Sequence, residues 1–103
     1  MDFIIGVDGG GTKTEAAAFG MDGQLLGRVQ GGASNPHAVS YEQAIPNLTA
    51  VLDALLAQPG LSPSRCKAVC LGLAGVDSDE ERTPFQLALA NYAREKKAAP
   101  FSC

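Results

Sequence analysis

The chain has no tryptophan, one histidine and only three cysteines among its 103 residues: Cys66, Cys70 and Cys103. The sequence contains no Cys-x-x-Cys spacing, and one histidine cannot complete the usual ligand sets, so a zinc site is not expected. We expect reduced thiols that fill small positions in the core or at an edge. On a regular strand, Cys66 and Cys70 would share a face roughly 13 Å apart, which is too far for a disulfide.

The sequence also has few basic residues and no long apolar run. Eight Lys and Arg stand against eleven Asp and Glu, for a formal net charge of -3. The basic residues do not cluster, so nucleic acid is not an expected partner. The apolar run at the amino end, Phe3 to Val7, is short and follows an acid, so we predict neither a signal peptide nor a membrane span and expect a cytoplasmic protein. The length and the 46% apolar content fit one domain with a modest core.

The first third of the chain predicts three strands. Residues 3–8 are an apolar, β-rich run that stops at an acid and three glycines. Residues 12–19 contain three alanines that favour a helix, but the segment is short and ends at a glycine. Asp22-Gly23 then provides a turn before residues 24–30, so we predict two antiparallel strands joined by that turn.

A helix is predicted after the loop at residues 31–36. Ser40 is the expected N-cap, with Gln43 completing a capping box. Pro46 either kinks this helix or marks its first turn, and Gln58-Pro59-Gly60 ends it. Apolar residues spaced three and four apart form one face: Ile45, Leu48, Leu52 and Leu55.

A fourth strand and a second helix follow. Residues 68–73 read as a buried strand, and Ser78 with Glu81 forms a second capping box. The helix is expected to end near Lys96-Lys97, and its regular part could instead start at Thr83-Pro84. Its apolar face comprises Phe85, Ala88, Leu89, Tyr92 and Ala93.

The turn after the first strand combines one acid, three glycines, two threonines and a lysine: Asp8, Gly9, Gly10, Gly11, Thr12, Lys13 and Thr14. Glycines lack a Cβ, so successive backbone N–H groups can approach an anion closely and converge on it. The threonines add hydroxyl donors and Lys13 adds a mobile charge. Asp8, at the end of the strand, is placed to hold Mg²⁺ through water. The sequence therefore predicts a site for the phosphates of ATP and for Mg²⁺.

Commoner glycine-rich motifs fit this turn less well. A Walker A loop needs glycine, lysine and Ser/Thr in succession, but Thr12 separates Gly11 from Lys13. A dinucleotide fingerprint that starts at Gly9 would need a glycine where Thr14 stands. A glycine-rich hairpin without a ligand explains neither the acid before the glycines nor the lysine after them.

Three segments resemble one known family. Residues 5–14 resemble the first phosphate motif of the N-acetylglucosamine kinase and BadF/BadG/BcrA/BcrD-type ATPase family, within the actin, sugar kinase and Hsp70 superfamily. Residues 32–37 resemble the family's segment after the third strand, and residues 71–77 resemble its strand-four glycine turn. The motifs occur in the family's order, so the resemblance is specific for the family and less so for the substrate.

The resemblance implies a fold and a set of site residues. The fold would be α/β, a ribonuclease H-like (actin-like ATPase) lobe with three antiparallel strands, then a parallel strand, and two helices. Asp8 would be the magnesium-side acid, and Gly9 to Lys13 would cradle the β- and γ-phosphates. Asn35, His37 and Gly75 would be the substrate residues, although His37 could equally cap backbone groups.

The function implied is that of an ATP-dependent amino-sugar kinase, which transfers the γ-phosphate of ATP to a sugar hydroxyl. In the family, the aspartate that accepts the hydroxyl proton lies on a fifth strand, so residues 1–103 would be a partial lobe without a catalytic base. Asp77 and Asp79 are expected to cap a helix instead. We therefore expect the chain alone to be inactive.

Two other functions stay open. An activator ATPase for a radical dehydratase would need cysteines for an iron–sulfur cluster, and Cys66 and Cys70 do not resemble such a site. A non-catalytic nucleotide-sensing or assembly module would use the same fold to pair with another chain through its open sheet edge. If the protein assembles, a homodimer is the expected form.

Overall fold

The computed structural model describes residues 2–73 and 78–95 of the chain, which form one sheet and two main helices. The strands are β1 (Phe3–Gly9), β2 (Thr14–Gly20), β3 (Leu25–Gly31) and β4 (Cys66–Leu73). The helices are α1 (Tyr41–Leu56) and α2 (Asp79–Glu95), and a short 3-10 turn, Pro63–Arg65, precedes β4.

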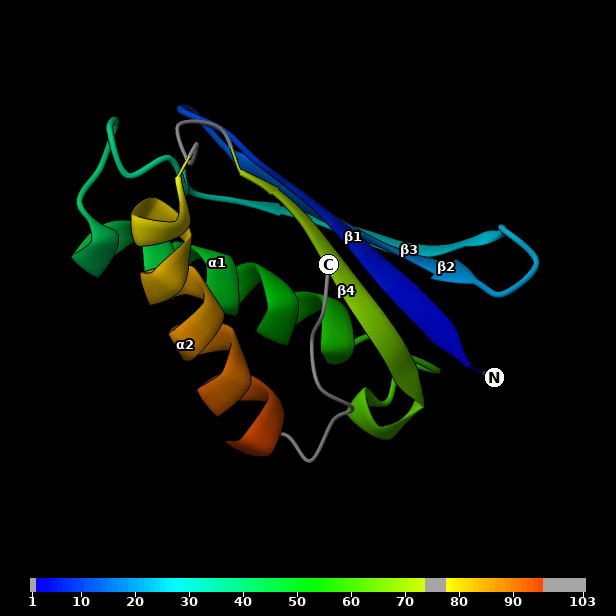
Figure 1. Cartoon of the computed structure of the whole chain (residues 1–103). Helices are drawn as coiled ribbons and strands as arrows, with labels where there is room; N and C mark the ends of the chain where they lie inside the picture. Colours follow the sequence, from blue (N-terminus) through cyan, green and yellow to red (C-terminus); the bar gives the residue numbers. More distant parts are fainter. Residues whose placement is uncertain (1, 74–77, 96–103) are drawn as a thin grey trace.

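The sheet has the strand order β3-β2-β1-β4. β1 pairs antiparallel with β2 and parallel with β4, and β2 pairs antiparallel with β3. The expected mixed sheet, with three antiparallel strands followed by a parallel one, is therefore confirmed. Both helices pack on the same face of the sheet, and no described helix covers the opposite face (Figure 1).

The strands alternate between the helix-covered face and the open face. In β1, Phe3, Ile5 and Val7 are buried beneath the helices, whereas Ile4 and Asp8 are exposed. β2 alternates in the same way, and its alanines lie in the sheet although alanine is a strong helix former. Packing overrides this propensity, because small side chains on β2 let α1 lie close to the sheet.

A single core fills the space between the sheet and the helices. α1 contributes a face that includes Leu48, Leu52 and Leu55, as its periodicity predicts, and α2 contributes Phe85, Leu89 and Tyr92. The aromatic rings of Tyr41 and Phe85 join the two helices, with centroids 5.6 Å apart. Within the described residues, no helix is both long and apolar enough to cross a membrane.

The prediction that the two cysteines of β4 share a face is wrong. Phe3 pairs with Cys66 but Ile4 pairs with Ala68, so a β-bulge at the start of β4 shifts the alternation by one residue. Cys66 consequently faces the core, and Cys70 lies on the exposed face. Burial raises the pKa of the Cys66 thiol. Neither cysteine forms a disulfide, as expected.

The helix starts differ in how they are capped. Ser40 precedes α1 in an extended conformation but makes no side-chain cap bond, so the predicted capping box with Gln43 is not formed. Pro46 lies inside α1 and does not start it. At α2, the Glu81 N–H donates to Oγ of Ser78 at 3.2 Å, which confirms that cap.

The alternative start of α2 at Thr83-Pro84 is wrong, because the helix begins at Asp79. Its predicted end near Lys96-Lys97 lies outside the described residues, as does Cys103.

A partly buried hydrogen bond between the helices predicts a loss of stability at alkaline pH. The Tyr92 hydroxyl of α2 donates to Oδ1 of Asp53 on α1 at 2.6 Å. Burial, followed by this bond and the Asp53 charge, raises the pKa of the Tyr92 phenol well above its usual value. Below pH of about 10, both folded and unfolded chains keep the phenol proton, and the stabilisation is complete. Above that pH the unfolded chain releases the proton while the folded chain holds it, so the free energy of unfolding falls as pH rises.

Tyr92→Phe should remove this part of the pH dependence. We expect the variant to lose about 1 kcal/mol at pH 7 and to show a shallower decline than the wild type above pH of about 10. Urea unfolding at several pH values measures the free energy of unfolding and its pH dependence. The lysines and Cys66 also titrate at alkaline pH, but they are the same in both proteins, so their contribution cancels in the difference between wild type and variant. Parallel curves for the two proteins would contradict the assignment.

Candidate functional site

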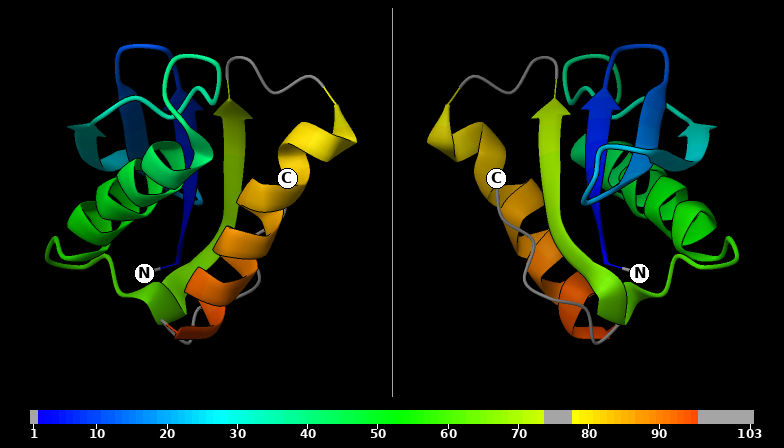
Figure 2. Two further views of the ribbon diagram at one scale, coloured as in Figure 1. Left: turned by 90° about the vertical axis from the view of Figure 1, so that its left-hand side faces the viewer. Right: turned by 90° about the vertical axis from the view of Figure 1, so that its right-hand side faces the viewer.

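Three segments meet at the end of the sheet where β1 and β4 terminate. They are the β1–β2 hairpin at residues 10–13, the loop at residues 32–40 after β3, and the first turn of α2. In Figures 1 and 2 the hairpin and the loop lie side by side at this end of the molecule. The carboxyl ends of parallel strands are where α/β folds most often bind ligands.

Gly10 joins the hairpin to the loop. Its N–H donates to the Lys13 carbonyl at 2.9 Å and closes the hairpin. Its carbonyl accepts from the N–H groups of Ser34 and Asn35, at 3.2 and 3.3 Å. The Gly10 N–H is therefore engaged within the hairpin, and its backbone fixes the position of the loop.

Thr14 has a role different from the one its place in the motif predicts. Its side chain is fully buried, and its Oγ1 lies 2.7 Å from the Gly32 carbonyl and 2.7 Å from Oγ of Ser34, which is also buried. The Thr14 hydroxyl therefore holds the loop after β3 through these two hydrogen bonds, whereas the sequence motif predicts that it binds the phosphates.

The exposed part of the turn consists of Gly11, Thr12 and Lys13. Among the described residues, none is hydrogen-bonded to the backbone N–H groups of these three residues. Gly9, by contrast, is buried at the end of β1 and pairs with Thr14 and with Leu73. Three successive donors at an exposed glycine turn can bind an anion.

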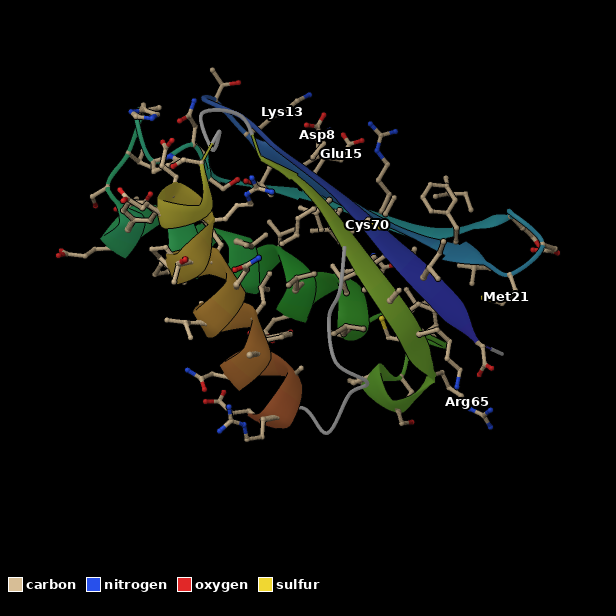
Figure 3. The ribbon with its side chains drawn as sticks, viewed as in Figure 1. Asp8, Lys13, Glu15, Met21, Arg65 and Cys70 are labelled. Carbon is tan, nitrogen blue, oxygen red and sulfur yellow. The ribbon has the colours of Figure 1, made fainter. Side chains whose placement is uncertain are left out.

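Two carboxylates lie on the open face next to this turn. Asp8 of β1 and Glu15 of β2 are directly opposite each other in the antiparallel register, with Lys13 close by (Figure 3). The Asp8 carboxylate makes no hydrogen bond or ion pair with any of residues 2–73 and 78–95. It is therefore available to a ligand.

Glu15 is a candidate site residue that the sequence motif did not indicate. Its Oε2 accepts from Arg28 at 2.8 Å and from Gln30 at 2.7 Å, both on β3. These hydrogen bonds, the one from Arg28 first, lower the pKa of the Glu15 carboxyl. Glu15 therefore stays ionised while its charge is balanced, and Asp8 is left as the carboxylate without such a partner. The strand pairing could have predicted this neighbour of Asp8.

An open groove of about 390 Å³ runs along the uncovered sheet face and reaches Asp8. Its lining comes from β1, β2 and β4: Gly6, Val7, Asp8, Glu15, Ala17, Phe19, Cys70, Leu71 and Gly72. The groove is mainly apolar, with the two carboxylates at one end.

Asn35 lies beside the glycine turn. A Cβ built on Gly11 would lie 4.0 Å from the Asn35 Nδ2 atom. The Asn35 Oδ1 atom accepts from the His37 N–H at 2.9 Å, which closes a short turn of the loop. The Asn35 amide nitrogen makes no hydrogen bond with the described residues, so it is a donor that Asn35 can offer to a ligand.

The other predicted substrate residues have different positions. The His37 ring is exposed, and its Nε2 atom lies 2.8 Å from Oε2 of Glu81 on α2, so it is held by a hydrogen bond across the site. Gly75 and Asp77 lie outside the described residues. Asp79 is the first residue of α2.

The residues present fit the expected binding of Mg²⁺ by Asp8. Within the described chain, no group of three or more His, Cys, Asp or Glu side chains could hold a metal by itself. Mg²⁺ is usually held by one or two carboxylates together with water and phosphate oxygens, and needs no cage of protein ligands. The available carboxylate of Asp8, next to a turn with donors for phosphate, matches that requirement.

A comparison with models of known protein families shows to which family the chain belongs. The model of the BadF/BadG/BcrA/BcrD ATPase family matches residues 5–98, which is nearly the whole chain. The chain belongs to this family. The actin-like ATPase lobe that the sequence resemblance implied is confirmed by the mixed sheet and the two helices.

Proteins similar to the chain include sugar kinases. The chain is 34% identical over 83 residues to an N-acetylmuramic acid/N-acetylglucosamine kinase of Clostridium acetobutylicum, covering 81% of the chain and 27% of that kinase. It is 30% identical over 88 residues to an N-acetyl-D-glucosamine kinase of Dictyostelium discoideum, covering 79% of the chain and 28% of that kinase. The chain thus spans less than a third of the length of these relatives.

Solved structures share this fold. A proposed N-acetylglucosamine kinase from Chromobacterium violaceum superimposes with a TM-score of 0.67 at 31% identity, over 84% of the chain and 31% of that protein. YeaZ from Pseudomonas aeruginosa superimposes with a TM-score of 0.54 at 14% identity, over 95% of the chain and 41% of that protein, and shares the fold alone.

Proposed function

We propose that this chain is the amino-terminal, phosphate-binding part of an ATP-dependent amino-sugar kinase. The reaction would transfer the γ-phosphate of ATP to a hydroxyl of glucosamine or N-acetylglucosamine. The names of the relatives support this substrate class. A cytoplasmic location and a homodimer belong to the same proposal.

One observation carries the proposal: hydrogen bonds hold the loop at residues 32–40 against the turn at residues 10–13, which we call the phosphate turn after the role proposed for it. The Gly10 carbonyl binds the N–H groups of Ser34 and Asn35, and the Asn35 amide lies beside Gly11. Phosphoryl transfer depends on positioning the acceptor oxygen next to the γ-phosphate. The Asn35 amide would donate to a hydroxyl of the sugar and hold it next to the γ-phosphate.

Each residue of the turn then has a chemical task. The exposed N–H groups of Gly11, Thr12 and Lys13 would bind phosphate oxygens, and the Lys13 ammonium would balance their charge. Asp8 would hold the magnesium ion, which, when bound, neutralises the charge that develops on the phosphates. Gly9, Gly10 and Thr14 would shape the turn. The proton acceptor, and the rest of the nucleotide site, would come from outside residues 1–103.

The activator ATPase is less well supported. Cys66 is buried in the core and Cys70 lies on the exposed sheet face, so the two thiols point to opposite sides of β4. They cannot ligate one iron–sulfur cluster without unfolding the strand.

Sugar-dependent turnover of ATP tests the proposal. The test protein is a full-length kinase that carries residues 1–103 as its amino-terminal segment, called the full-length kinase below. We expect N-acetylglucosamine or glucosamine to be phosphorylated at the expense of ATP and Mg²⁺, and the 103-residue chain alone to be inactive. ATP hydrolysis that no amino sugar stimulates would contradict the kinase function.

A further inference from the structure

The loop that carries Asn35 is held from two sides. On one side, the Gly10 carbonyl binds the backbone of Ser34 and Asn35. On the other side, His37 reaches across to Glu81 of α2, a residue 44 positions away in the chain. The first contact joins the loop to the phosphate turn, and the second joins it to a separate helix.

His37 connects Glu81 to the Asn35 side chain. An ionised carboxylate only accepts hydrogen bonds, so the His37 Nε2–H donates to Glu81 Oε2, at 2.8 Å. The backbone N–H of the same histidine donates to Asn35 Oδ1 at 2.9 Å. Fixing the ring therefore also fixes the backbone that orients the Asn35 amide. Rotation of that amide would exchange its donor for an acceptor beside Gly11.

Glu81 is itself held firmly at the start of α2. Its N–H donates to Ser78 Oγ at 3.2 Å, and the Ser78 hydroxyl lies 3.2 Å from Glu81 Oε1. The Glu81 carbonyl accepts from the Tyr41 hydroxyl of α1 at 3.2 Å. A carboxylate in the first turn is also favoured by the positive end of the helix. Glu81 is therefore fixed by contacts with both α1 and the cap of α2, although the loop that it holds lies at the surface.

We propose that Glu81 is a positioning residue for the acceptor sugar, which acts through His37 to keep the Asn35 amide directed at an acceptor oxygen. This inference rests on the proposed kinase function. The chemistry that it assigns to the site is one N–H donor, from Asn35, for a hydroxyl or carbonyl oxygen of the sugar. Glu81 does not touch the sugar in this account.

The position of His37 and Glu81 predicts that removing either side chain weakens acceptor binding more than it lowers global stability. Both side chains are partly or largely exposed, at 69% for His37 and 27% for Glu81, so their contribution to global stability is small. Their contribution to acceptor binding is larger, because they orient the Asn35 amide, the donor proposed to bind the sugar oxygen. Neither residue contacts the exposed N–H groups of the phosphate turn, so ATP binding should be little affected.

The experiment measures KM and kcat of the full-length kinase with Glu81→Ala, His37→Ala and the double variant. We expect the KM for the amino sugar to rise roughly 10-fold in each single variant, with the KM for MgATP and kcat within about twofold of wild type. The double variant should be no worse than either single one, because both act through one bond. Glu81→Gln keeps an acceptor for the His37 N–H and should restore part of the affinity.

Glu80→Ala is the matched control, because Glu80 is the exposed acid next to Glu81 in the same helical turn. Its kinetic constants should equal those of the wild type. An unchanged sugar KM in Glu81→Ala and His37→Ala would overturn the inference and leave the kinase function standing, as would effects that add in the double variant. A lower melting temperature with kcat and both KM values altered together would indicate a merely structural role, which also overturns it. A wild-type protein without sugar-dependent turnover would remove the proposed function and this inference with it.

Discussion

Lys13→Ala in the full-length kinase should lower kcat for amino-sugar phosphorylation about 100- to 1,000-fold, the usual cost of removing one preorganised group that stabilises transition-state charge. Lys13 is exposed at the glycine turn, within reach of the groups that would bind phosphate. Lys67→Ala is the matched control, since Lys67 is an exposed lysine at the start of β4 that forms an ion pair with Asp2 at 3.7 Å. It should have wild-type kinetics.

Asp8→Ala should lower kcat by a similar factor and should also change the Mg²⁺ requirement. Because Asp8 would hold the magnesium ion, the variant should need a higher Mg²⁺ concentration for its residual activity. Measuring turnover against Mg²⁺ separates this effect from a general loss of folding. If both variants turned over at the wild-type rate with an unchanged Mg²⁺ requirement, the assignment of the turn would be wrong.

Gly31→Ala is expected to destabilise the chain. A Cβ on Gly31, at the end of β3, would lie 2.3 Å from Cγ2 of Val51 in α1. Val51 is buried in the core and β-branched, so it cannot turn aside, and the helix would have to move. We expect a loss of about 1–3 kcal/mol in the free energy of unfolding, or a Tm lower by about 4–8 °C for each kcal/mol.

A second substitution, Val51→Ala, tests whether the contact with Val51 causes the loss of stability in Gly31→Ala. Val51→Ala removes the clashing methyl groups, so the double variant Gly31→Ala/Val51→Ala should be more stable than the sum of the single losses predicts. Gly6→Ala is the control, because a Cβ on that strand glycine would meet its neighbour at an ordinary 4.0 Å. Thermal unfolding followed by circular dichroism measures the four variants and the wild type. Strict additivity would show that the close approach of α1 to β3 is not what excludes a side chain at Gly31.

The elements that local signals specify could be predicted from the sequence. The Asp22-Gly23 turn separates β2 from β3, and Gly23 has a φ of +90°, which favours glycine. The Ser78 cap of α2 and the apolar face of α1 also follow from spacing alone. Each of these depends on residues within a few positions of one another.

Features that depend on distant partners could not be predicted in this way. The β-bulge that separates the faces of Cys66 and Cys70 results from the pairing of β4 with β1. The burial of Thr14 arises from its contacts with Gly32 and Ser34, 18 and 20 residues away. Nothing near His37 in the sequence indicates its pairing with Glu81. In the phosphate turn the residue types suggested the chemistry, and the fold determined which groups are exposed.

Titration calorimetry of MgATP into the full-length kinase tests the central claim most directly, because it measures phosphate binding without requiring turnover. Wild type and the Lys67→Ala control should give the same isotherm, and Lys13→Ala should bind MgATP at least about 10-fold more weakly. Identical affinities for wild type and Lys13→Ala would contradict the assignment of the turn that follows β1 to the phosphates of ATP.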